Sequence, residues 1–209
     1  MSKILLYNRG VRLAREFCRV NDLPQPHIRA VPKAKWFVQA CAFYRPDVGP
    51  GRKHSLPVLP DHVRGINVCL DECAYPAGEV TSRNWSWPGN AVDRTPFGVV
   101  LHELGHHVDW ESGTDKGKYW SDFCVRVKTI AGESGLTTYA DTNPAEWFAE
   151  AMRLYVGNVG LLRELRPRTC TELFKLVKPL RHCAFGWRKC LGPDVPGRIV
   201  RSLENKGAK

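Results

Sequence analysis

The apolar residues of this chain recur with two kinds of spacing, and each spacing predicts one kind of element. Apolar positions three or four residues apart indicate helices, and short runs of aromatic and β-branched residues indicate strands. The helices expected on this basis span residues 9–20, 96 to a turn at 113–117, 119–132, 144 to 158, 158–165 and 169–181. The expected strands span residues 34–44 and 63–70. In the third helix the apolar residues on one side are Trp120, Phe123, Val127 and Ile130.

Three of these helices begin with recognisable start signals. Thr95 is a candidate N-cap because its hydroxyl can accept a hydrogen bond from a backbone N–H of the first helical turn. Pro96 suits the first helical position, where its missing N–H is not needed. Asn143 and Pro144 repeat this arrangement further along the chain. The Thr-x-x-Glu pattern at residues 169–172 resembles a capping box and predicts that a helix starts at Thr169.

The remaining segments are predicted to be irregular. Residues 46–60 are rich in proline, and residues 71–93 form a long segment that contains Trp85 and Trp87. These two tryptophans either line a cleft in front of the following helix or serve as packing residues. The glycines, prolines and charges of residues 183–209 predict an irregular basic tail.

Charge is distributed unevenly along the 209 residues, which is a length typical of one domain. The net charge of +10 divides into +8 over residues 1–60, −6 over residues 61–160 and +8 over residues 161–209. Basic flanks can bind nucleic acid or another acidic partner, or they can simply form a solvated surface. No basic motif interleaved with aromatic residues favours nucleic acid.

The chain has no apolar run near the roughly 20 residues that a membrane-spanning helix needs. The apolar patch at residues 4–7 is also too short for a secretory signal, so we expect a cytoplasmic protein with reduced thiols. None of the eight cysteines forms a CxxC pair. Buried thiols are the simpler interpretation, and a structural zinc site is an alternative for four residues, Cys170, His182, Cys183 and Cys190.

The clearest chemical signal is an HExxH motif, His102-Glu103-Leu104-Gly105-His106. On a helix, residues four apart lie on the same face, so His102 and His106 can bind one zinc ion. Glu103 would then lie beside the open coordination position, where a water molecule binds. The alternative is a pair of histidines on a partly buried helix.

A catalytic zinc site needs a third protein ligand. The pattern HExxHxxGxxH is excluded because Asp109 and Ser112 occupy its last two defining positions. Glu146 and Glu150 are candidates on a later helix, one turn apart, and we assign Glu146 to the metal and Glu150 to the free N–H of a ligand histidine. A helix-capping role for Glu146 and a surface position for Glu150 are the alternatives. Asp109 is a further candidate for a histidine N–H or for a salt bridge.

The segments HELGHHVDW and LTTYADTNPAEWFAEAMRLY together resemble the catalytic domain of anthrax lethal factor and its relatives, which include the Pro-Pro endopeptidases. The resemblance covers Phe97 to Tyr155, and more loosely the chain to about residue 181. It implies that zinc is bound by His102, His106 and Glu146. It also implies that Glu103 is the general base and that Tyr139 faces the active site, although Tyr139 could also be a packing residue.

The resemblance further implies an α+β fold of the zincin type over residues 1–182, with a small twisted sheet and a mainly helical C-terminal half. Residues 1–33 are expected to form a basic arm or helix of this single domain, and a strand over 34–44 or 63–70 to hold an extended peptide. The expected function is that of a zinc endopeptidase acting on a protein or peptide. The alternative is a non-catalytic, metal-binding structural protein or a protein associated with nucleic acid.

Overall fold

The computed structural model describes residues 2–36, 40–46, 64–73, 93–115 and 120–180, and within these ranges the chain has an α+β fold. Its helices are α1 (Lys3–Val20), α2 (Pro96–Ser112), α3 (Asp122–Ala131), α4 (Pro144–Gly157), α5 (Val159–Leu165) and α6 (Pro167–Leu176). Its strands are β1 (Ile28–Ala30), β2 (Ala42–Arg45) and β3 (Gly65–Val68), and a short 3-10 helix, η1, spans Lys33–Lys35.

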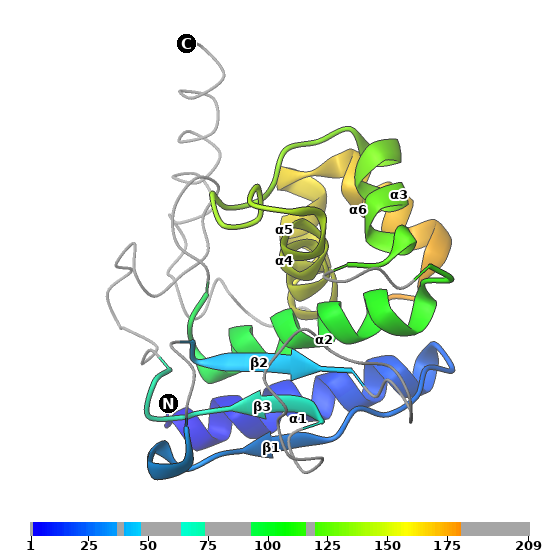
Figure 1. Ribbon diagram of the computed structural model, residues 1–209. Coiled ribbons are helices and arrows are strands. Elements are labelled where there is room, and N and C mark those ends of the chain that lie inside the picture. The colour runs from blue at the N-terminus through cyan, green and yellow to red at the C-terminus, as the bar shows by residue number, and fades with distance from the viewer. Residues whose placement is uncertain (1, 37–39, 47–63, 74–92, 116–119, 181–209) are drawn as a thin grey trace.

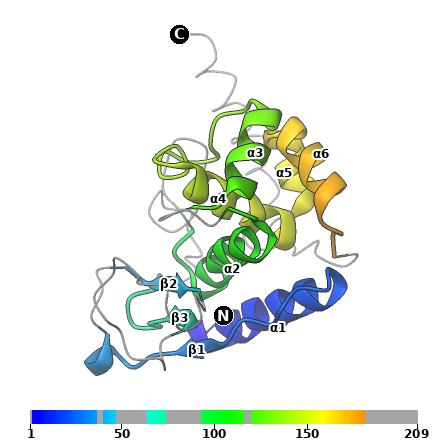
Figure 2. The same ribbon diagram turned by 45° about the vertical axis from the view of Figure 1, so that its right-hand side comes forward.

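Helix α2 runs through the middle of the molecule. The sheet and α1 lie on one side of it, and α4 lies on the other side with α3, α5 and α6 (Figures 1 and 2). Leu101 and Leu104 of α2 are fully buried, because both sides of the helix are covered. The middle of α2 is therefore held between two packed layers.

Among the described residues, the sheet has the strand order β1-β3-β2, so β2 forms one edge of this part of the sheet. Strand β3 is parallel to β1 and antiparallel to β2, and its Ile66 pairs with Ile28 on one side and with Tyr44 on the other. All four residues of β3 are buried, as expected for a central strand. The strand predicted over 63–70 is therefore present in its central part.

The strand predicted over 34–44 is only partly present. Residues Lys33–Lys35 form η1, residues 37–39 lie outside the described part, and pairing begins at Ala42. Strand β1 was not predicted, because three residues that follow Pro24 and Pro26 are too few for a periodic signal.

Helix α1 begins at Lys3, six residues before the predicted start. The Ser2 hydroxyl accepts a hydrogen bond from the Leu5 N–H at 3.4 Å, which caps the helix. Leu6 and Phe17 are buried, and a Cβ atom on Gly10 would lie 3.1 Å from the Val100 Cβ of α2. The expected basic arm is thus largely a core helix that packs closely against α2.

Two details of the C-terminal half differ from the prediction. Helix α3 begins only at Asp122, so Trp120 precedes it. Within the helix, Phe123 and Val127 are buried as expected, whereas Ile130 is exposed.

Helix α6 begins at Pro167, so the predicted capping box at Thr169 is wrong. The Thr169 hydroxyl instead donates to the Glu133 carboxylate at 2.8 Å, and the Thr169 N–H donates to the same oxygen at 2.8 Å.

Several predictions lie outside the described residues. They concern the loops over 46–60 and 74–92, the tryptophans Trp85 and Trp87, and the tail over 183–209. The structural zinc site also lies partly there, since it would need His182, Cys183 and Cys190. Among the described helices, none is both long and apolar enough to cross a membrane.

Replacing Gly105 by alanine should lower the free energy of unfolding by about 2 kcal/mol, because an added methyl group overpacks a tight helix contact. A Cβ atom on Gly105 would lie 2.5 Å from the Ala149 Cα, which is backbone of α4 and cannot rotate away. Chemical denaturation measures the effect. The matched control is Gly160→Ala, since the added Cβ meets nothing nearer than 3.6 Å there and should be neutral or slightly stabilising. Equal stability of Gly105→Ala and wild type would contradict the close packing.

Candidate metal centre

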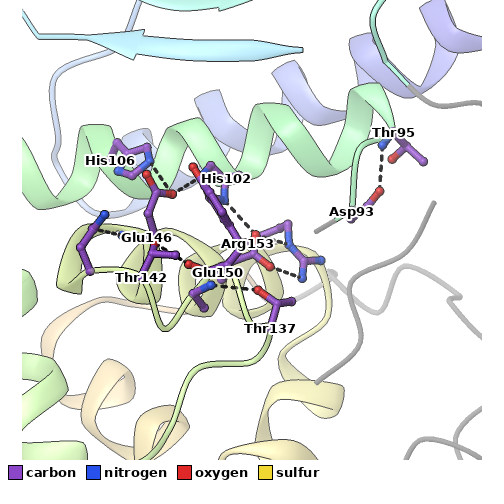
Figure 3. Close-up of polar contacts among 12 residues, drawn as sticks. Asp93, Thr95, His102, His106, Thr137, Thr142, Glu146, Glu150 and Arg153 are labelled. Atoms are coloured by element: carbon purple, nitrogen blue, oxygen red, sulfur yellow. Dashed lines mark hydrogen bonds and ion pairs between the residues drawn. The ribbon is translucent and has the colours of Figure 1, made fainter. Parts of the chain in front are cut away.

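Three side chains with metal-binding atoms meet between α2 and α4. They are His102 and His106 of α2 and Glu146 of α4, and one ligand atom of each lies within 4.8 Å of the others (Figure 3). The Glu146 Oε2 atom lies 3.0 Å from the His102 Nε2 and 3.5 Å from the His106 Nε2. The structure thus brings together the three residues that the sequence analysis assigned to zinc.

Local sequence explains why these atoms converge. The Thr95 hydroxyl accepts from the Gly98 N–H at 3.2 Å and starts α2, so that His102 and His106 share one face. The Asn143 side chain accepts from the Glu146 N–H at 3.0 Å and starts α4, as predicted from its capping signal. The backbone of Glu146 is therefore fixed in the first turn, while its carboxylate extends toward α2.

The donor arrangement fits a bound cation. The His102 Nδ1 lies 2.8 Å from the Glu150 Oε1, so in the neutral ring the Nδ1–H donates to that carboxylate and the Nε2 carries a lone pair. That lone pair faces the Glu146 Oε2, which is buried and has no hydrogen-bond partner. Two acceptors 3.0 Å apart repel each other unless a positive charge lies between them. Two imidazoles and one carboxylate form a ligand set that zinc adopts in catalytic sites.

The charges around His102 also favour a cation. Burial lowers the pKa of His102, but its contacts with the Glu146 and Glu150 carboxylates outweigh it and raise the pKa to about 10, which favours a positive charge on the side of the ring that faces Glu146. Burial likewise raises the pKa of Glu146, yet the two histidines hold it well below its ordinary value. The site therefore attracts positive charge, as a proton or as a metal ion.

Glu150 lies behind His102 and is fully buried. Besides the His102 ring, it binds Arg153 one turn along α4, with Nε 3.2 Å from Oε1 and a terminal guanidinium nitrogen 3.1 Å from Oε2 (Figure 3). Burial raises the pKa of Glu150, but Arg153 and His102 together lower it below the ordinary value. Sequence reasoning expected the histidine contact and missed Arg153, although an arginine in the apolar run AMRLY was a usable signal.

Glu103 is buried beside the same site, where it lines a cleft of about 240 Å³. Burial raises the pKa of its carboxyl, and the nearby His102 and His106 oppose that effect. The backbone N–H of Tyr44 in β2 hydrogen-bonds to Glu103, which ties the edge strand to the motif. The cleft is lined by Ala40, Cys41, Ala42, Arg94, Val99, His102, Glu103 and Tyr139.

Tyr139 lies across this cleft on a turn before α4, with its ring 5.9 Å from the His102 ring. The turn is held by two hydrogen bonds, from the Thr142 hydroxyl to the Tyr139 carbonyl at 2.7 Å and from the Ala140 N–H to the Thr137 hydroxyl at 3.0 Å. Burial and the charge of Glu146 raise the pKa of Tyr139, so its hydroxyl stays protonated and can donate. The structure thus places Tyr139 on the same cleft as His102 and Glu103.

Asp109 differs from the expectation. Its carboxylate accepts from the Ser121 hydroxyl and N–H and from the Cys124 N–H at 2.8 Å, all at the start of α3. Both of its oxygens are used by these donors, so Asp109 joins α2 to α3 rather than supporting a ligand histidine.

His107, which the sequence analysis left unassigned, is also structural. Its ring nitrogens contact the Tyr44 hydroxyl at 3.2 Å and the Pro24 carbonyl at 2.7 Å, and these contacts join α2 to β2 and to the segment between α1 and β1.

Replacing Arg153 by methionine should destabilise the fold by about 3–5 kcal/mol, because it leaves the Glu150 carboxylate buried without its charged partner. Arg126→Met is the control, since Arg126 is exposed and its nearest carboxylate oxygen on Asp122 is 3.7 Å away. That control should cost less than about 1 kcal/mol. Denaturant titration of both variants measures the change in the free energy of unfolding. Similar decreases in the two variants would show that the buried Glu150–Arg153 pair contributes no more to stability than an exposed pair.

A scan of protein-family models gives no match to this chain, and searches of the curated proteins and of the solved structures give none either.

Proposed function

We propose that this protein is a zinc-dependent endopeptidase with a fold of the zincin type, similar to the catalytic domain of lethal factor and the Pro-Pro endopeptidases. The observation that carries the proposal is the buried Glu146 oxygen facing the Nε2 atoms of His102 and His106 without a hydrogen bond of its own. Glu103 and Tyr139 line the cleft next to these atoms, which supports catalysis rather than a structural metal site.

The substrate is a protein or peptide bound in extended form along β2. Of the two strands expected to hold a peptide, β3 is central and pairs with a strand on each side, whereas β2 lies at an edge of the described sheet and borders the cleft. Ala42 of β2 lines the cleft, and the preceding Cys41 does so as well. A peptide that adds a strand to this edge passes the metal ligands, and its main chain supplies the hydrogen bonds.

Peptide hydrolysis follows from the roles of the side chains. Zinc, when bound, supplies an activated water and polarises the scissile carbonyl. Glu103 accepts the proton of that water and returns it to the leaving amine, a role suited to a buried carboxyl with a raised pKa. The Tyr139 hydroxyl donates to the negative charge that develops on the carbonyl oxygen. Glu150 keeps His102 in one tautomer and one orientation throughout.

Glu103→Gln should retain zinc and lose peptide cleavage by about 10³-fold, because the amide cannot accept the proton. Zinc content is measured by metal analysis of the purified chain, and cleavage with a peptide library in the presence and absence of a chelator. Glu111→Gln, two turns along the same helix, is the matched control and should cleave like wild type. Undiminished cleavage by Glu103→Gln would overturn the assigned base. A wild type that binds zinc without cleaving any peptide would favour the non-catalytic alternative.

Glu146→Ala should lose stoichiometric zinc, because two histidines alone seldom hold the ion. The readout is the zinc-to-protein ratio after dialysis, which is independent of any activity. Glu172→Ala removes a half-buried carboxylate paired with Lys175 on α6, outside the candidate metal centre, and should leave the ratio unchanged. If Glu146→Ala keeps its full zinc content, Glu146 is not the third ligand and another carboxylate must bind the ion.

A further inference from the structure

Two cysteines meet at the wall of the cleft. Cys41 directly precedes β2 and lines the cleft together with His102 and Glu103. Its thiol hydrogen-bonds with that of Cys73, and both residues are buried free thiols. Chemical change at the Cys41 sulfur therefore takes place beside the metal ligands.

The backbone holds this pair in place. Ala42 pairs with Val68 in the antiparallel ladder, and the next residue, Cys69, donates its N–H to the Cys41 carbonyl at 3.0 Å. A turn closed by the Glu72 N–H and the Cys69 carbonyl at 3.1 Å then brings Cys73 back to Cys41. The two thiols are therefore within hydrogen-bonding reach of each other, which places them as partners for a disulfide.

The two thiols differ in character. The hydrogen bond with Cys73 lowers the pKa of Cys41 to about 6, and the Arg94 guanidinium contributes to this lowering against the effect of burial. The same hydrogen bond and burial raise the pKa of Cys73. By contrast, burial raises the pKa of Cys18 to about 12 and raises that of Cys170. A thiolate is the nucleophile in disulfide exchange, and Cys41 is the member of the pair that lines the cleft, so an incoming disulfide reacts at Cys41.

We propose that Cys41 is a modification site for small-molecule disulfides in the wall of the cleft, and that Cys73 is the thiol that resolves the adduct. The Cys41 thiolate attacks one sulfur of the disulfide, forms a mixed disulfide and releases the other half as a thiolate. Once Cys41 is in the mixed disulfide, its thiolate no longer raises the pKa of Cys73. The Cys73 thiol then gives its proton to the released thiolate and attacks the Cys41 sulfur, and the second half leaves as a thiolate that takes a proton from solvent. The two protein thiols are oxidised to one disulfide, and the small disulfide is reduced to two thiols.

The two products affect the cleft differently. A mixed disulfide places the added group at Cys41, among the residues where the peptide is proposed to bind. Formation of the Cys41–Cys73 disulfide removes that group. The expected effect on peptide cleavage rests on the proposed function. The reactions of the two thiols do not depend on it.

The test treats the full chain with glutathione disulfide at neutral pH and maps the products by peptide mass spectrometry. Wild type should yield the Cys41–Cys73 disulfide, and Cys73→Ser should accumulate glutathione on Cys41. Cys41→Ser should lose modification at both positions, while Cys69→Ser, from the same turn, should behave as wild type. Far-ultraviolet circular dichroism checks that each variant is folded.

The internal controls are Cys18, Cys124 and Cys170, which should stay unmodified during the same time. Adducts on these three at the rate of Cys41 would overturn the proposal, as would a Cys73→Ser variant without an adduct on Cys41. Peptide cleavage is the second readout, with Cys73→Ser inhibited more than wild type and restored by dithiothreitol. If no form of the protein cleaves peptides, the proposed function fails, and the mass map still decides the thiol chemistry.

Discussion

The close contact between α2 and α4 at Gly105 and Ala149 is the constraint on which the rest of the site depends. A side chain at position 105 would meet backbone atoms of α4, so only glycine lets the two helices approach this closely. The approach lies between His102 and His106 in the sequence of α2, and it brings Glu146 of the facing helix within reach of both rings. The glycine of the motif therefore determines the distance between ligands that lie on different helices.

That packing also buries a set of charges. His102, Glu150 and Arg153 lie in contact, and the carboxylate between the two basic groups has no exposed surface. Removing charged groups from water is unfavourable, so this arrangement is stable only because each partner satisfies the next. A further buried carboxylate, Asp93, accepts from the Thr95 N–H at 2.9 Å and experiences the charge of Arg153 (Figure 3). The start of α2 and the ligand site are thus linked through the same arginine.

The edge strand β2 connects the remaining features. It hydrogen-bonds to Glu103 through its backbone, contacts His107 through Tyr44, and begins directly after Cys41. The proposed peptide site and the proposed thiol site therefore share one short strand, held against α2 at two positions. Modification of Cys41 would therefore alter the side of the cleft along which the peptide is proposed to bind.

The sequence by itself determined those features that depend on neighbours along one helix: the caps at Thr95 and Asn143, the face shared by His102 and His106, and the spacing of Glu146 and Glu150. Helical periodicity and local capping decide such features without distant contacts. Only the tertiary structure decided which carboxylate Arg153 binds. The same holds for the hydrogen bonds of Asp109 to the start of α3 and for the contact between Cys41 and Cys73. These contacts join segments far apart in the chain or compete among several local partners, and no spacing rule determines them. The early start of α1 and the presence of β1 also depend on tertiary contacts. Helix α1 packs against α2 and β1 pairs with β3, and neither contact can be read from the local pattern of residues.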